Sequence, residues 1–402
     1  MSLAAGSNTP GSARRRRNSL LAFGLAGIAV RVLLWWISIG SNDAVIWSWH
    51  AQHVATHGLA QTYRTYQAFP QFNHPPLMGL YAAQSWVWSH GDLWEFARWL
   101  KIPGIAGEAL VMWVIWRLAG LRACVVYAWL PAPILVSSFH GSTDSLYAAL
   151  VLVAAIAFDR ERYFLSGLLW SASLNVKLLP LILIPLVFLG VPNRRALLLL
   201  ACGFALGMVP FLPTALTAGK AMYQNMLAYN SFPRNWGLMA LLNAGLGNPA
   251  LRSVCETLRG SWMAAGRYVV LLAVLGVAAL SRYRRKMLMI EQSALGAALF
   301  FVLTPGFAPQ YVVFVAPLLC VVDFREGVLW GWTSGVFIGA LYWIGEVSWM
   351  PLQSWLLGYG DFPATVVGMM AWAVLVHFTL VHIRAAWIGD PAYLPLEAFP
   401  GK

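Results

Sequence analysis

The chain has 402 residues, of which 59% are hydrophobic and only 10% are charged, and its formal net charge is +12. A soluble domain carries roughly 25% charged residues, so this composition excludes a soluble globular protein and indicates that lipid is the solvent. The Lys and Arg residues lie in short clusters between apolar runs. That pattern is typical of positive-inside membrane topology and excludes nucleic acid as the predicted partner.

The N-terminal segment predicts how the chain enters the membrane. Residues 1–19 are polar and contain Arg14–Arg17, and an apolar run from Leu20 to Gly40 follows. A signal peptide has the same order of features, but this run is too long for one and no small-residue cleavage motif follows it. We therefore predict a cytoplasmic tail, an uncleaved first transmembrane helix, and one membrane domain over residues 20–402.

Basic clusters later in the chain set the predicted topology. They are Arg117 with Arg122, 159–162, Arg194 with Arg195, 282–286, 323–326 and Arg384. If all of them face the cytoplasm, the segments between them cross in pairs. The remaining spans are then expected near 103–120, 123–139, 145–158, 162–176, 178–191, 196–212, 262–281, 287–304, 310–323, 327–345 and 363–383. The predicted fold is an all-α polytopic bundle of about twelve transmembrane helices.

Two large extracytoplasmic loops are expected, at 41–102 and 213–261. Within the first, Ser41 or Asn42 can cap a helix beginning at Asp43, and Gly58 can end it. The loop is rich in Trp, which is typical of helices that lie at a membrane surface.

A second helix of this loop is predicted near residues 75–90, with Asn73 as its cap and Pro75 in its first turn. We favour a surface position for it. If it crossed the membrane instead, every later segment would be inverted and Arg117 and Arg122 would lie outside.

Five motifs occur in a characteristic order. They are SNDAVIW (Ser41–Trp47), FNHPPLMGLY (Phe72–Tyr81), HGSTDSLYAALVLVAA (His140–Ala155), SGLLWSASLNVKLLPLILIP (Ser166–Pro185) and TPGFAPQYVVFVAPLL (Thr304–Leu319). In this order, and with this predicted sidedness, they resemble the GT-C superfamily of glycosyltransferases that use polyprenyl-phosphate sugars. Relatives include the protein O-mannosyltransferases, the lipid A aminoarabinose transferase, and mannosyl- and arabinosyltransferases of bacteria.

The resemblance implies a function on the outer face of a membrane, here predicted to be a bacterial inner membrane. A sugar would pass with inversion from a polyprenyl-phosphate donor to a glycan, lipid or protein acceptor. Asp43 matches the catalytic carboxylate of the family, which takes the acceptor's proton. Without the resemblance, its position alone would suit a first-turn helix carboxylate.

The resemblance and the local pattern together nominate six substrate-binding residues. Asp144 matches the family's second outer acid, although a helix cap explains it equally well. Lys177 is an isolated cation in an apolar stretch, placed to stabilise the departing phosphate; snorkelling to the headgroups is the alternative. His74, Arg234, Gln310 and Tyr311 are the other candidates. For Arg31, within the first helix, snorkelling is expected.

No bound metal or other cofactor is predicted. His53 and His57 have the i, i+4 spacing of a helical ligand pair, but no acidic third ligand lies near them in sequence. No pair among the four cysteines has metal-ligand or redox spacing. They are Cys124, Cys202, Cys255 and Cys320.

Two other classes of function remain open from the sequence. A transporter or flippase-like protein would place polar residues in mid-span and show symmetry between its halves. A non-catalytic lipid-binding relative would keep the architecture without turnover. The polar residues gather at the outer loops, so we favour the transferase.

Overall fold

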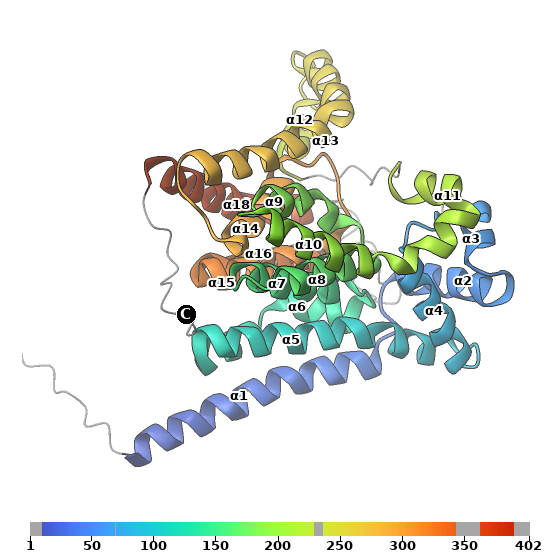
Figure 1. Ribbon diagram of the computed structural model, residues 1–402, viewed down its shortest axis with the longest axis horizontal. Coiled ribbons are helices and arrows are strands. Elements are labelled where there is room, and N and C mark those ends of the chain that lie inside the picture. Colours follow the sequence, from blue (N-terminus) through green and yellow to red (C-terminus); the bar gives the residue numbers. More distant parts are fainter. Residues whose placement is uncertain (1–9, 69, 229–235, 343–361, 390–402) are drawn as a thin grey trace, which may run out of the picture.

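The computed structural model describes residues 10–68, 70–228, 236–342 and 362–389 of the chain, and every regular element within them is helical (Figure 1). The all-α prediction is therefore confirmed. The elements are α1 (Pro10–Ile37), α2 (Asn42–His57), α3 (Leu59–Thr65), α4 (Pro76–Trp88), α5 (Leu93–Ala128), α6 (Pro131–Ile134), η1 (Leu135–His140), α7 (Asp144–Asp159), α8 (Tyr163–Val176), η2 (Leu179–Leu183), α9 (Ile184–Leu189), α10 (Arg194–Gly207), η3 (Val209–Phe211), α11 (Leu212–Met226), α12 (Gly237–Gly245), α13 (Arg252–Tyr283), α14 (Met289–Leu303), η4 (Pro309–Phe314), α15 (Val315–Val322), α16 (Phe324–Leu341) and α18 (Phe362–Ile388).

Five segments of the described chain are long and apolar enough to cross a membrane. They are Arg17–Ile37, Leu93–Ala128, Arg194–Met226, Arg252–Tyr283 and Ala364–Ile388. Their outward faces are apolar, since Leu25, Leu198 and Leu272 are each about two-thirds exposed (65%, 66% and 67%). Surfaces of this kind are stable only against lipid, so the chain is a multi-pass integral membrane protein.

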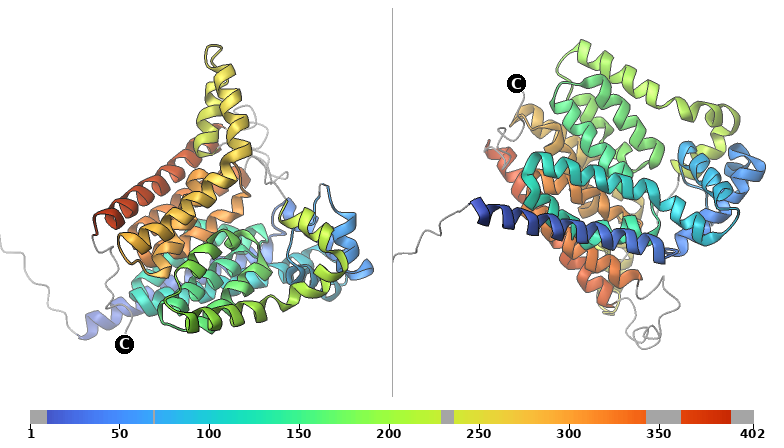
Figure 2. Two further views of the ribbon diagram at one scale, coloured as in Figure 1. Left: turned by 45° about the horizontal axis from the view of Figure 1, so that its top comes forward. Right: turned by 90° about the horizontal axis from the view of Figure 1, so that it is seen from below.

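Helix bounds differ from the predictions in two regions. α5 begins at Leu93, within the predicted first loop, because Asp92 caps it by accepting from the Glu95 N–H at 2.8 Å. The predicted second loop at 213–261 also contains the helices α11 and α12 and the start of α13. The α12–α13 hairpin projects away from the bundle at the top of Figure 1 and in the left view of Figure 2.

The predicted break between two spans near residue 120 is present. Gly120 has φ 83° and interrupts α5, so the helix direction changes there. Only glycine adopts this conformation without strain.

Small residues allow close helix packing in the bundle. α8 and α10 are in extensive contact. A Cβ added at Gly167 would clash with the Leu200 carbonyl oxygen, and one added at Gly203 would clash with the Phe164 carbonyl oxygen. Such close approach stabilises helix pairs in lipid, where apolar burial alone gives no driving force.

The expectation that Arg31 snorkels is wrong. Its side chain is buried and ion-paired with Glu108 of α5 at 3.6 Å, and it also donates to the carbonyls of Gly27 and Ala128. The Tyr127 hydroxyl donates to Glu108 at 3.5 Å. Ion pairing and hydrogen bonds satisfy a charge that water cannot reach, so this cluster fastens α1 to α5.

The helices α2, α3, α4 and α11 gather at one end of the bundle, on the right of Figure 1. α2 starts as expected, because the Ser41 hydroxyl accepts the Asp43 N–H at 3.2 Å, and Gly58 ends it. The expected cap of α4 is wrong. Pro75 takes that position with extended backbone and Pro76 starts the helix, because proline needs no N–H partner there.

Candidate functional site

Asp43 lies where three distant segments meet. The His140 Nε2–H, at the end of η1, donates to Asp43 Oδ2 at 3.1 Å, and the Gln310 side-chain amide of η4 donates to the same oxygen at 3.0 Å. The Asp43 side chain keeps 38% of its surface exposed, whereas the His140 side chain is buried. The carboxylate is thus held on one side and accessible on the other.

The backbone brings Asp43 and His140 together. The Ser41 N–H donates to the His140 carbonyl at 3.1 Å, and the His140 ring stacks on Tyr342 with centroids 5.2 Å apart. Gly40 adopts φ +113°, and a Cβ there would lie 2.5 Å from the His140 carbonyl oxygen. Only glycine permits this approach.

We expect Gly40→Ala to separate Asp43 from His140 and to lower both stability and activity. The added methyl meets backbone that cannot move aside, and the positive φ alone costs about 1–2 kcal/mol. Gly58→Ala is the matched control, because Gly58 has φ +79° but open space around it. A melting-temperature loss no larger for Gly40→Ala than for Gly58→Ala would contradict this explanation.

Lys177 and Asp144 form the second part of the site. Lys177 Nζ lies 4.0 Å from Asp144 Oδ1, and the Asp144 side chain is only 1% exposed. Lys177 Nζ also lies 5.2 Å from the ring centroid of Tyr311, the neighbour of Gln310. Asp144 occupies the first turn of α7, where the helix dipole favours a carboxylate. η4 therefore links this pair to Asp43.

A cavity of about 670 Å³ opens beside this pair. Its polar lining includes Lys177, Arg267, Tyr311 and Asn73, and its walls are otherwise largely apolar, from η2, α13 and α14. Leu271, one of the wall residues, is 40% exposed, and its neighbour Leu272 is 67% exposed. Cations in the lining and apolar walls are the features that an anionic lipid head and its chain require.

His74 occupies a packing position. It is buried and stacks on Trp47 with ring centroids 3.6 Å apart. Burial, together with the positive charge of Lys177, holds the pKa of His74 well below its usual value. The ring is therefore neutral at pH 7, and it interacts electrostatically with Lys177.

Burial also lowers the pKa of His50 to about 4, although its hydrogen bond to the Pro70 carbonyl opposes the shift. The folded protein therefore resists a proton that the unfolded chain accepts below about pH 6.5. We expect the α2–α4 region to lose stability, by roughly 3 kcal/mol, as the pH falls from about 6.5 to about 4. Hydrogen exchange of α2 at several pH values measures this.

His50→Gln should reduce that pH dependence, and the part that remains should come from buried His74, whose pKa is also lowered. His57→Gln should leave it unchanged, because His57 is an exposed histidine of the same helix. An unchanged slope in His50→Gln would show that other groups titrate.

Among the other sequence candidates, Arg234 lies outside the described residues. The structure adds three site residues that the sequence did not nominate. His140 lies in the same motif as Asp144, and Asn73 lies in the same motif as His74. Arg267 lies just after the predicted loop–helix boundary near residue 262. The position of His140 and Asn73 within the quoted motifs was a signal that could have identified them. Arg267 had no such signal, because only the packing of α13 brings it to the cavity.

The described residues contain no group of three or more His, Cys, Asp or Glu side chains that could hold a metal ion. His53 Nδ1 shares a hydrogen bond with the Thr62 hydroxyl at 2.9 Å, and its ring stacks on His57. The four cysteines are free.

Fold and site together define a helical multi-pass membrane protein with a carboxylate and a cation–carboxylate pair at one end. No protein-family model and no curated protein matches the chain. Among solved structures, it is similar to ArnT from Cupriavidus metallidurans in the apo state, with 15% identity over 92% of this chain and 78% of that chain and a TM-score of 0.48. That likeness assigns neither an activity nor a site.

Proposed function

We propose that the protein is an inverting glycosyltransferase that moves a sugar from a polyprenyl-phosphate carrier to a hydroxyl-bearing acceptor at the extracytoplasmic face. The observation that supports it best is the arrangement of Asp43, held by His140 and Gln310, next to the Lys177 cavity. The five motifs that resemble the GT-C superfamily supply most of these residues.

Asp43 suits the role of general base. Two donors, His140 and Gln310, hold its carboxylate in place, and a carboxylate held beside the acceptor can take its proton. In the proposed step the acceptor oxygen attacks the anomeric carbon from the face opposite the phosphate. Its proton passes to Asp43, the carbon–oxygen bond to phosphate breaks, and polyprenyl phosphate leaves.

Lys177 suits the leaving group. The departing phosphate gains negative charge, and a cation already in place stabilises that charge in the transition state. Arg267 of the same cavity is a second candidate phosphate ligand. The apolar walls would take the first isoprene units, and the exposed outer face of α13 would guide the rest of the chain into lipid.

The test is turnover of purified protein with polyprenyl-phosphate mannose, glucose, arabinose and galactose, each with and without a lipid extract as acceptor source. Release of polyprenyl phosphate with one of the sugars supports the proposal. Absence of both turnover and saturable donor binding across the panel would contradict it, and would favour the transport or lipid-binding alternatives.

A further inference from the structure

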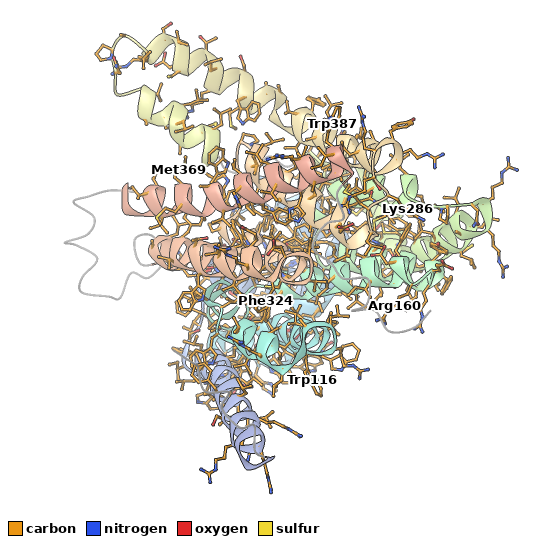
Figure 3. The ribbon with its side chains drawn as sticks, turned by 90° about the vertical axis from the view of Figure 1, so that its left-hand side faces the viewer. Trp116, Arg160, Lys286, Phe324, Met369 and Trp387 are labelled. Atoms are coloured by element: carbon orange, nitrogen blue, oxygen red, sulfur yellow. The ribbon has the colours of Figure 1, made fainter. Side chains whose placement is uncertain are left out.

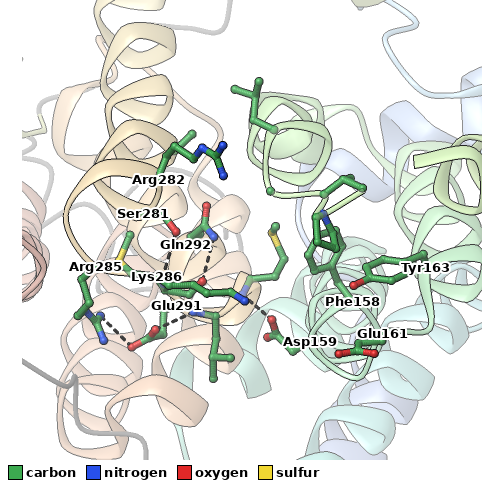
Figure 4. A pocket seen from close by; sticks show the side chains of 18 residues that line it. Phe158, Asp159, Glu161, Tyr163, Ser281, Arg282, Arg285, Lys286, Glu291 and Gln292 are labelled. Carbon is green, nitrogen blue, oxygen red and sulfur yellow. Dashed lines mark hydrogen bonds and ion pairs between the residues drawn. The ribbon is translucent and has the colours of Figure 1, made fainter. Parts of the chain in front are cut away.

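A second cavity, of about 600 Å³, lies at the opposite end of the bundle from Asp43. α7 runs from Asp144 at the candidate site to Asp159 at this cavity, a rise of roughly 22 Å at 1.5 Å per residue. The other walls are formed by the C-terminal end of α9 at Leu189, the last turns of α13 and the first turn of α14 (Figure 4). Figure 3 looks onto this end, with Arg160 and Lys286 labelled there.

Two acids of this cavity already have partners. Asp159 accepts the N–H groups of Met289 at 2.6 Å and Ile290 at 3.1 Å, which begin α14. Glu291 accepts the Leu288 N–H at 2.9 Å and pairs with Arg285 at 3.2 Å. These carboxylates therefore hold the α13–α14 turn in shape.

The remaining charges favour an anion. Arg282 and Lys286 also line the cavity, both are exposed, and the described part of the chain gives neither of them an ion pair. The third acid of the cavity lining is Glu161, which lies near Tyr163 in Figure 4. Unlike Asp159 and Glu291, it accepts no backbone N–H of the α13–α14 turn among the described residues. The two positive charges of Arg282 and Lys286 exceed the single negative charge of Glu161.

Part of the cavity lining is apolar. Leu189 is 61% exposed, and Val191, Pro192 and Ala278 continue the same lining. A cavity of a membrane protein that is lined by both exposed cations and apolar side chains fits an amphiphile with an anionic head, because basic pockets between transmembrane helices bind lipid phosphates. A soluble anion would gain nothing from Leu189.

We propose that this cavity binds the phosphate headgroup of an anionic phospholipid from the leaflet opposite the candidate active site. Arg282 and Lys286 contact the phosphate, and Leu189 contacts the first part of an acyl chain. The site does not depend on the proposed transferase function, because it shares no residue with the Asp43 and Lys177 clusters.

The test is native mass spectrometry of the full chain, with phosphatidylglycerol or phosphatidylcholine as the probe. We expect the wild type to retain phosphatidylglycerol preferentially. The double variant Arg282→Gln/Lys286→Gln should retain it roughly 30-fold less, since each cation near a membrane surface contributes about a fivefold factor. Glu161→Gln should retain it more strongly than the wild type.

Arg194→Gln/Arg195→Gln is the matched control, because it removes the same charge at exposed positions of α10 outside the cavity. Equal losses in both double variants, or equal retention of the two lipids by the wild type, would overturn the proposal. Displacement of phosphatidylglycerol by millimolar inorganic phosphate would show a free-anion site and remove the lipid assignment. Lipid-dependent melting temperatures provide a second readout of the same variants.

Discussion

Asp43→Asn is expected to lower the turnover number by about 10²–10⁴-fold, the usual contribution of a positioned general base, while donor affinity stays close to that of the wild type. The asparagine side chain keeps the shape of the carboxylate and can still accept a hydrogen bond from Gln310, but it cannot take the acceptor's proton. Steady-state release of polyprenyl phosphate, with donor binding measured separately, distinguishes the two effects.

Asp92→Asn is the matched control for this experiment. Asp92 caps α5, and asparagine caps a helix equally well, so the same chemical change should leave both stability and activity unchanged. Turnover that survives in Asp43→Asn would exclude Asp43 as the base and direct attention to Asp144. Loss of donor binding together with turnover would indicate a structural role.

Lys177→Gln is expected to have the second large effect, on both stability and activity. Asp144 is fully buried, and removal of its partner leaves a buried carboxylate uncompensated, which costs about 3–5 kcal/mol for a pair of this kind. Loss of the cation beside the leaving phosphate should also lower the turnover number by roughly 10²–10³-fold. Thermal unfolding and donor turnover measure the two effects separately.

A double variant separates these two roles of Lys177. Lys177→Gln/Asp144→Asn removes the buried charge together with its partner and should regain most of the lost stability, but it should stay inactive. Recovery of activity in the double variant would show that Lys177 only neutralises Asp144 and does not contact phosphate. Lys220→Gln, at an exposed position of α11 at the same end of the bundle, should change neither quantity.

Local sequence signals were sufficient for much of the helix pattern. The break near residue 120 was predicted from the cluster of Arg117 with Arg122, and the start of α2 was predicted from Ser41, because both signals depend on a few residues close together in sequence. Runs of apolar residues likewise predicted most helices of the bundle within a few residues. Asn73 misled the prediction for α4, because the Pro75–Pro76 pair starts that helix without a side-chain cap.

Partners that lie far apart in sequence needed the tertiary structure. Arg31 pairs with Glu108 across 77 positions, and hydropathy alone cannot choose between such a pair and snorkelling. Gln310 reaches Asp43 across 267 positions, and His140 across 97. These contacts depend on how η1 and η4 pack against the start of α2.

The sequence by itself determined that this is a helical membrane protein, because charge and hydropathy act locally along the chain. The resemblance of its motifs nominated Asp43 and Asp144, and the apolar surroundings of Lys177 marked that residue as a candidate. Only the tertiary structure decided that His140 and Gln310 hold Asp43, that Lys177 neutralises Asp144, and that Arg267 lines the same cavity. The physical reason is that hydrogen bonds and ion pairs act over a few ångströms in space, and helix packing sets which side chains come within that distance.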